Sequence, residues 1–116
     1  DTYPSFDHCD SLSEKIALKR CFEDFVTSTL YTELSNLTII VQESVLDTVW
    51  VDFVVNETGN FCLDSIHLTP TVRKEIPELS LWIHDATQAL PKSHPAIKRD
   101  IPVKTRFKVP VILKVN

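Results

Sequence analysis

Three cysteines are the residues of this chain with the most obvious reactive chemistry: Cys9, Cys21 and Cys62. No two of them have the C-x-x-C spacing, so the common zinc-binding and thioredoxin-like motifs are absent. A bridge between Cys9 and Cys21 would close a loop of about a dozen residues and stabilise the fold by roughly 3 kcal/mol. Two reduced core cysteines are the alternative, and the residues alone leave both open. We expect Cys62, in a strand-like segment, to be a small buried residue rather than a nucleophile.

The histidines show no pattern that is typical of catalysis or metal binding. His84 and Asp85 are neighbours in a predicted helix, where adjacent side chains point apart and make a poor catalytic dyad. His8, His67 and His94 lack ligand spacing with cysteines or acids, and we expect them on or near the surface. Neither a glycine-rich phosphate loop nor a G-x-S-x-G motif occurs. We therefore expect no catalytic residue, no metal and no cofactor, and a binding protein rather than an enzyme.

Size and composition are those of one small globular domain. The chain has 116 residues, of which 43% are hydrophobic and 24% charged, and this length is too short for two independent cores. Acidic and basic residues are interleaved and the formal net charge is −4, which argues against a nucleic-acid partner. No segment approaches the roughly 18 apolar residues that span a bilayer. The first residues are not a signal peptide, so we expect any targeting or anchoring segment to lie outside this sequence.

The positioning elements begin with a helix. Ser11 and Glu14 have the spacing of a capping box, and apolar residues then recur at three- and four-residue steps, which predicts an amphipathic helix that ends near Ser35-Asn36. We expect residues 1–12 to be a lead-in to this helix. The segment 37–43 is ambiguous, since its β-branched run suggests a strand while the family resemblance given below suggests a short helical turn.

A hairpin is expected next. Apolar residues alternate from Val49 to Val55, the period of a strand with one face on a core. Gly59, the only glycine of the chain, is placed to take a left-handed conformation in the loop 56–60. The returning strand, 61–68, must then be antiparallel to the first.

The last part of the chain predicts a second helix and a long final strand. Thr69-Pro70 ends the hairpin, and a helical apolar face follows to Leu90, with Pro77 in the first turn of the helix. Residues 93–100 are a connecting loop, and 102–115 form an extended segment. Pro110 within it implies an edge strand or a bulge. The sequence therefore predicts an α+β fold, in the order α-β-β-α-β, with two helices packed on one face of a three-stranded antiparallel sheet.

Three stretches of the chain also carry a resemblance to a known family. The first is Tyr3-Pro4 through Cys9-Asp10, followed by Cys21-Phe22. The second is the V-x-V-x-F-V-V strand at 49–55 with N-E-T-G-N at 56–60. The third consists of L-P-K-x-x-P at 90–95, R-x-x-P-V at 99–103 and F-x-V-P-V at 107–111. In this order and spacing, the stretches resemble the C-terminal domain family of TonB-type energy-transducing proteins, particularly versions from Bacteroidetes-type bacteria.

The resemblance implies a periplasmic protein-binding domain, with residues 1–116 as a single TonB C-terminal-like domain. It implies an exported protein, and so favours the Cys9–Cys21 disulfide. The implied partners are an extended peptide of an outer-membrane transporter and, through an N-terminal anchor, a proton-driven motor of the inner membrane. The peptide would add a strand to an exposed sheet edge. The candidate edge is the final strand, at Val103, Lys104, Thr105, Arg106, Phe107, Lys108 and Val109.

Two alternatives stay open at this point. The alternating Lys and Arg of the candidate edge are also the usual protection of an edge strand against aggregation, and domains with exposed edges can form homodimers through the same strand. The family's Tyr-Pro pair would fall at Asn36-Leu37, where it is absent. A stand-alone exported structural or protein-interaction module with the same fold is therefore the alternative function.

Overall fold

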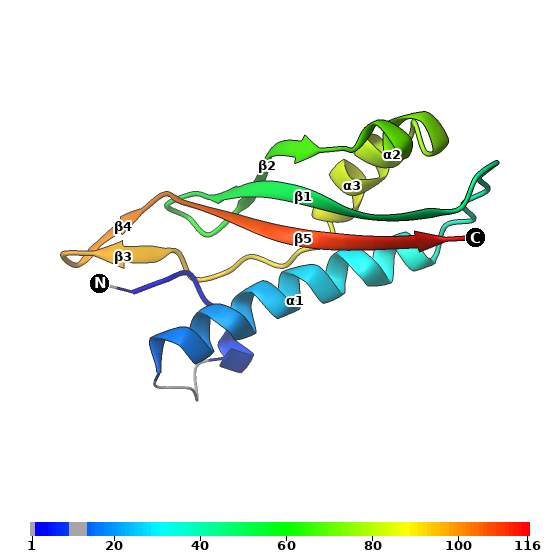
Figure 1. Ribbon diagram of the computed structural model, residues 1–116. Helices are drawn as coiled ribbons and strands as arrows, with labels where there is room; N and C mark the ends of the chain where they lie inside the picture. Colours follow the sequence, from blue (N-terminus) through cyan, green and yellow to red (C-terminus); the bar gives the residue numbers. More distant parts are fainter. Residues whose placement is uncertain (1, 10–13) are drawn as a thin grey trace.

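The mixed α+β fold that the sequence predicts is confirmed, with a three-stranded antiparallel sheet at its centre. The computed structural model (Figure 1) describes residues 2–9 and 14–116. The sheet has the strand order β2-β1-β5, and both strand pairs are antiparallel. The elements in chain order are η1 (Asp7–Cys9), α1 (Lys15–Ser35), β1 (Val45–Val55), β2 (Phe61–His67), α2 (Pro70–Glu75), α3 (Leu79–Thr87), β3 (Ala96–Lys98), β4 (Ile101–Val103) and β5 (Thr105–Val115).

One face of the sheet carries the core. Alternate residues of β1 and β5 are buried on this face, because successive side chains of a strand point to opposite sides. Helix α1 contacts β5 and α3, and α3 contacts β2, so the two helices lie side by side against this face. The other face, called the open face below, carries the remaining side chains of β1 and β5. The buried core residues of the two strands include Val49, Val51, Phe53, Val55, Phe107, Val109, Val111 and Leu113.

Helix α1 follows the expected pattern and ends where the sequence predicts. It buries the stripe Phe22, Val26, Leu30 and Leu34, ends at Ser35 and has Asn36 as its C-cap. Its N-cap is Glu14, and the Ser11 partner of the predicted capping box lies outside the described residues. No helix in the described part of the chain is both long enough and apolar enough to cross a membrane.

The ambiguous segment after α1 is neither a strand nor a helical turn. It is an irregular connection that leads into β1 at Val45, four residues before the predicted start. The backbone N–H groups of Gln42 and Glu43 donate to the carboxylate of Glu75 at 2.7 and 3.0 Å. These two bonds lower the pKa of Glu75 below its ordinary value, and they tie the connection to the end of α2.

The second helical region differs from the prediction, because it forms two helices instead of one that starts at Pro77. Pro70 does more than end a strand: it occupies the first turn of α2, where a proline loses no helical hydrogen bond. The side chain of Thr69 caps this helix by accepting from the Val72 N–H. Pro77 lies in the turn between the helices, and α3 begins at Leu79. A proline disfavours helical geometry in the residue that precedes it. Pro77 therefore keeps Ile76 out of a helix, and this separates α2 from α3.

The predicted connecting loop 93–100 contains a strand, and the predicted final strand is divided. Strands β3 and β4 form a small hairpin in which Ala96 pairs with Val103 and Lys98 with Ile101. Its turn residues, Arg99 and Asp100, have φ angles of 53° and 65°, the left-handed pair that a two-residue hairpin turn requires. The N-terminal lead-in extends this small sheet, since Thr2 pairs with Ile97 and Ser5 with His94.

Candidate functional site

Strand β5 is an edge of the main sheet in the described part of the chain, because β1 lies between it and β2. Its pairing with β1 runs in one continuous register, from Thr105 opposite Val55 to Val115 opposite Val45. Pro110 lies within this register, opposite Trp50. Of the two positions that the proline allowed, edge strand or bulge, the structure has the edge strand.

A contact with Tyr31 reveals which backbone groups of β5 face outward. The Ile112 N–H donates to the Tyr31 hydroxyl, and this hydroxyl donates to the Ile112 carbonyl at 3.1 Å. Both polar groups of Ile112 therefore face away from β1. Because alternate residues of a strand present their backbone groups to opposite sides, those of Arg106, Lys108 and Pro110 also face outward. Pro110 fits this pattern, since its missing N–H is one that the β1–β5 ladder does not use.

The outer edge of β5 is therefore open at Arg106 and Lys108. Each presents an N–H donor and a C=O acceptor away from β1, and no backbone group of residues 2–9 or 14–116 bonds to them there. A row of unpaired backbone groups on an edge strand is a template for a further strand. The chemistry that this edge can perform is main-chain hydrogen bonding to an extended peptide.

The structure gives the seven predicted edge residues different positions. Val103 belongs to β4 and already pairs with Ala96, and Lys104 lies between the two strands. Thr105, Phe107 and Val109 direct their backbone groups to β1, with Phe107 and Val109 in the core. Without Val103, the candidate edge is the run Lys104–Val109, which is called the docking window below.

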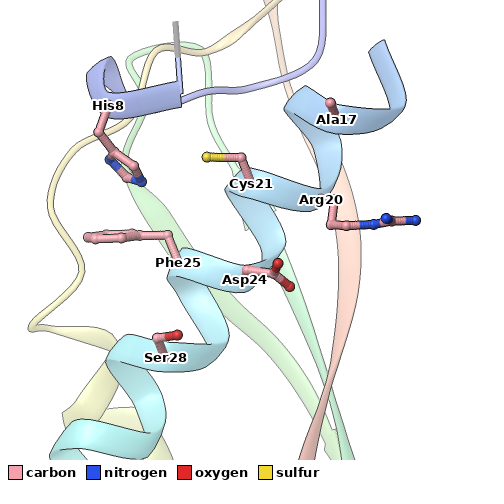
Figure 2. A pocket seen from close by; sticks show the side chains of 7 residues that line it. All are labelled: His8, Ala17, Arg20, Cys21, Asp24, Phe25 and Ser28. Atoms are coloured by element: carbon pink, nitrogen blue, oxygen red, sulfur yellow. The ribbon is translucent and has the colours of Figure 1, made fainter. Parts of the chain in front are cut away.

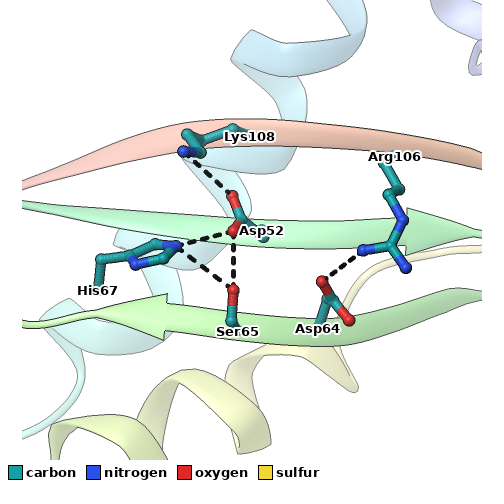
Figure 3. A network of polar contacts seen from close by, with 6 residues as sticks. All are labelled: Asp52, Asp64, Ser65, His67, Arg106 and Lys108. Carbon is teal, nitrogen blue, oxygen red and sulfur yellow. Dashed lines mark hydrogen bonds and ion pairs between the residues drawn. The ribbon is translucent and has the colours of Figure 1, made fainter.

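Charged side chains surround the docking window on the open face (Figure 3). Arg106 Nη1 lies 2.7 Å from Asp64 Oδ2 on β2, and Lys108 Nζ lies 3.8 Å from Asp52 Oδ1 on β1. The Arg106 and Lys108 side chains remain 75% and 53% exposed. They are therefore accessible to a partner while the acids on β1 and β2 hold them over the sheet. A shallow pocket lies beside them and includes Asp52, Asp64, Arg106 and Lys108 in its lining.

Asp52 is the centre of this polar network. Its Oδ2 lies 2.8 Å from His67 Nε2 and accepts from the Ser65 hydroxyl at 2.7 Å. These two hydrogen bonds, with a smaller contribution from the charge of Lys108, lower the pKa of Asp52. Although Asp, His and Ser meet here, the Ser65 hydroxyl lies 3.4 Å from the same His67 nitrogen. A catalytic triad needs the acid and the serine at different ring nitrogens, so the described geometry is not that of a triad.

The Cys9–Cys21 disulfide that the resemblance favours is present. The two Cα atoms are 6.0 Å apart, within the range of a disulfide, and the bridge fastens η1 to the first turns of α1. A shallow pocket beside it is lined by His8, Cys21 and Phe25, while Arg20 and Asp24 point away from His8 (Figure 2).

Among the described residues, one group could in principle hold a metal ion. The potential ligand atoms of His8, Cys9 and Cys21 lie within 4.8 Å of one another. The disulfide occupies both sulfur atoms, so the oxidised group retains a single free ligand, the His8 imidazole. A disulfide between Cys9 and Cys21 thus uses up the donor set of this candidate metal site.

The prediction that Cys62 is buried is wrong. Cys62 is a free, exposed thiol on β2 opposite Val54. Phe61 and Leu63, its neighbours on β2, pack against the core, so the alternation of the strand turns Cys62 to the open face. Sequence reasoning identified the strand but assigned this residue to the wrong side.

Two features of the site escaped sequence reasoning. The Tyr31 hydroxyl gave no signal, because a half-buried tyrosine on a helix is ordinary and its partner lies 81 residues away. The open face also carries three exposed apolar side chains where the start of β1 lies beside the end of β5: Leu46, Trp50 and Ile112. For Trp50 and Ile112 the signal was present, since they occupy alternate positions of the predicted strands, whereas Leu46 lies before the predicted start at Val49.

No family model, curated protein or solved structure matches this chain.

Proposed function

We propose that this chain is the periplasmic protein-binding domain of a TonB-like energy transducer, which captures an extended peptide of an outer-membrane transporter by strand addition. The observation that carries the proposal is the outward-facing backbone of Arg106 and Lys108 on an edge strand. The sequence resemblance supports the choice of this family through motifs that run from the Tyr3-Pro4 lead-in to the F-x-V-P-V segment at 107–111.

Strand addition at this edge follows from elementary hydrogen-bond chemistry. The two residues together offer two donors and two acceptors to a peptide, and each bond made contributes a net ~0.5–1.5 kcal/mol. Because main-chain groups form these bonds, the edge accepts different sequences of similar extended shape. Side chains then provide selectivity.

The charges at the docking window favour an acidic peptide. Lys104, Arg106 and Lys108 alternate along it and are exposed. Directly opposite residues on neighbouring strands lie within contact distance, and opposite charges in such pairs stabilise them. A peptide with Asp or Glu across from these cations would bind more tightly and faster, and increasing salt would weaken its binding.

The transducing role adds an inner-membrane motor and an N-terminal anchor that connects the domain to it. An anchor of this kind would precede residue 1 in the full protein. A transmembrane helix followed by a proline-rich spacer in that position would favour the energy transducer over a stand-alone module. A lipobox in that position would instead favour a stand-alone exported interaction module, an alternative supported by Asn36-Leu37 in place of the family's Tyr-Pro pair.

The proposal is tested by titrating the isotopically labelled domain with synthetic peptides from the periplasmic N-terminal segments of outer-membrane transporters. We expect amide shifts at the docking window, Lys104–Val109, and at the β1 residues that pair with it. Shifts centred on β2 would place binding on the other edge of the sheet. A folded domain that responds to no peptide would contradict the proposed function.

A further inference from the structure

Tyr31 occupies a place on the β5 edge that an added strand would otherwise take. It comes from α1, which packs beneath β5, and its side chain is half-buried. Its hydroxyl accepts from the Ile112 N–H and donates to the Ile112 carbonyl. One phenol thus satisfies both outward-facing groups of Ile112, as a residue of a neighbouring strand would do.

The free part of the edge is bounded on both sides. Towards the C-terminus, Pro110 can accept a hydrogen bond but has no N–H to donate, and the next outward-facing residue is Ile112. Towards the N-terminus, Val103 is already paired with Ala96 of β3. Between these limits, Arg106 and Lys108 each offer an N–H and a C=O to a new strand.

We propose that Tyr31 is a specificity-determining residue that ends the register of the docked peptide before Ile112. This inference rests on the proposed function, because it concerns the length of the segment that the same edge accepts. A peptide that continued past Pro110 would have to displace both Tyr31 hydrogen bonds and leave a half-buried hydroxyl to find another partner. Such a loss offsets the bonds that the longer peptide gains. The edge therefore selects a short extended segment whose chain turns away after the docking window.

The rival interpretation gives Tyr31 a packing role alone, with Pro110 ending the register. The two differ in what removal of the hydroxyl does. If packing is the only role, Tyr31→Phe leaves the footprint of a bound peptide unchanged, because the ring is retained. If the hydroxyl blocks Ile112, the same change opens one more outward-facing residue to the peptide.

The test compares wild-type domain, Tyr31→Phe and a control, Tyr3→Phe, which removes a phenol hydroxyl that has no hydrogen-bond partner among the described residues. Two probes are made from the transporter peptide that binds most tightly in the titration. The short probe is trimmed so that it pairs only with Lys104–Val109 of the domain, and the long probe is extended so that it reaches Ile112. Hydrogen exchange of the Arg106, Lys108 and Ile112 amides reports the footprint. We expect both probes to bind wild type and Tyr3→Phe equally and to protect Arg106 and Lys108. With Tyr31→Phe, the longer probe should also protect Ile112 and bind about two- to tenfold more tightly than the trimmed one, the equivalent of one hydrogen bond.

Two results would overturn the role of Tyr31 while leaving strand addition intact. One is tighter binding of the longer probe to wild type, with the peptide paired to Ile112. The other is an unchanged footprint and affinity in Tyr31→Phe. The wild-type comparison stands alone if the variant does not fold. A wild-type domain that binds neither probe contradicts strand addition itself, and the inference fails with it.

Discussion

A Cβ atom added to Gly59 would lie 1.8 Å from the carbonyl oxygen of Ser93, whose own N–H donates to the Gly59 carbonyl at 3.0 Å. Gly59 has a φ of +85°, so the glycine meets two requirements at once: the hairpin turn and the close approach of the chain that leads to β3. We predict that Gly59→Ala destabilises the fold by more than the ~1–2 kcal/mol of the left-handed conformation alone, because the Ser93 backbone must also move. Urea unfolding measures the change. Glu57→Ala, exposed in the same turn, is the control and should have little effect; equal stability of the two variants would contradict the account.

The cysteines should differ in reactivity. We predict that the folded, oxidised protein reacts with one equivalent of a thiol reagent at Cys62, and that unfolding under reducing conditions exposes all three thiols. Replacing both Cys9 and Cys21 by serine should destabilise the domain by roughly 3 kcal/mol. Cys62→Ser should abolish the native thiol signal and leave the unfolding free energy nearly unchanged. Three reactive thiols in the folded protein would contradict the disulfide.

Asp52 should contribute a pH-dependent part of the stability. Hydrogen bonds from His67 and Ser65 lower the pKa of Asp52 in the folded state, so its stabilisation is fully present above the ordinary Asp pKa of about 4 and is lost as the pH falls through the lower folded value. Asp52→Asn should therefore be less stable than wild type near neutral pH, and the difference should narrow in acid. Urea unfolding across this range checks the sign, with Asp85→Asn on the exposed side of α3 as control. A difference independent of pH would mean that the charge of Asp52 contributes nothing.

Glu23 should affect stability in the opposite direction to Asp52, because its charge destabilises the fold. It is half-buried on α1, and burial, the largest effect, raises its pKa. Its charged form is therefore less favourable in the folded state than in the unfolded chain. The penalty shrinks as the pH falls below the raised folded pKa, and it is gone below the ordinary Glu pKa of about 4.3. Glu23→Gln should stabilise the domain at neutral pH and change little in acid. A variant that is less stable than wild type at neutral pH would show that a favourable charge interaction outweighs burial.

The Tyr3 hydroxyl is buried without a hydrogen-bond partner among the described residues. Burial also raises its pKa, as expected for a phenol removed from water. An unsatisfied buried hydroxyl destabilises a fold by about 1–3 kcal/mol, so Tyr3→Phe should be at least as stable as wild type. Its ring, which packs edge-on against Phe22, is retained in the variant. A clear loss of stability in thermal unfolding would reveal a partner for this hydroxyl.

Much of the fold could be predicted because its strong patterns are local. The alternation around Val51 and Phe53, the single glycine of the hairpin and the proline within β5 each restrict the chain by steric or hydrogen-bonding rules. The β3–β4 hairpin could not be read in this way. Its turn uses Arg99 and Asp100 in left-handed conformations. Neither residue is a glycine, so the sequence did not indicate a turn of this type.

The candidate site could be predicted only in part, for the same reason. A proline in a strand pointed to the edge, but the side on which each backbone group lies depends on the register with β1. The outward-facing side is identified by the contact between Tyr31 and Ile112, which are far apart in the sequence. The error at Cys62 is similar, since the strand was clear while the face was fixed by the packing of its neighbours.

Strand addition at β5 is tested most directly by the affinity of a transporter peptide for Lys108→Pro. This change removes an outward-facing N–H that the β1–β5 ladder does not use, as Pro110 already does two residues further along, so the domain should remain folded. Lys108→Ala is the matched control, because it removes the same charge and keeps the N–H. We predict that Lys108→Pro binds the peptide about two- to tenfold more weakly than Lys108→Ala, the equivalent of the one hydrogen bond that is lost. Equal affinity of the two folded variants would contradict the central claim that the peptide pairs with this edge.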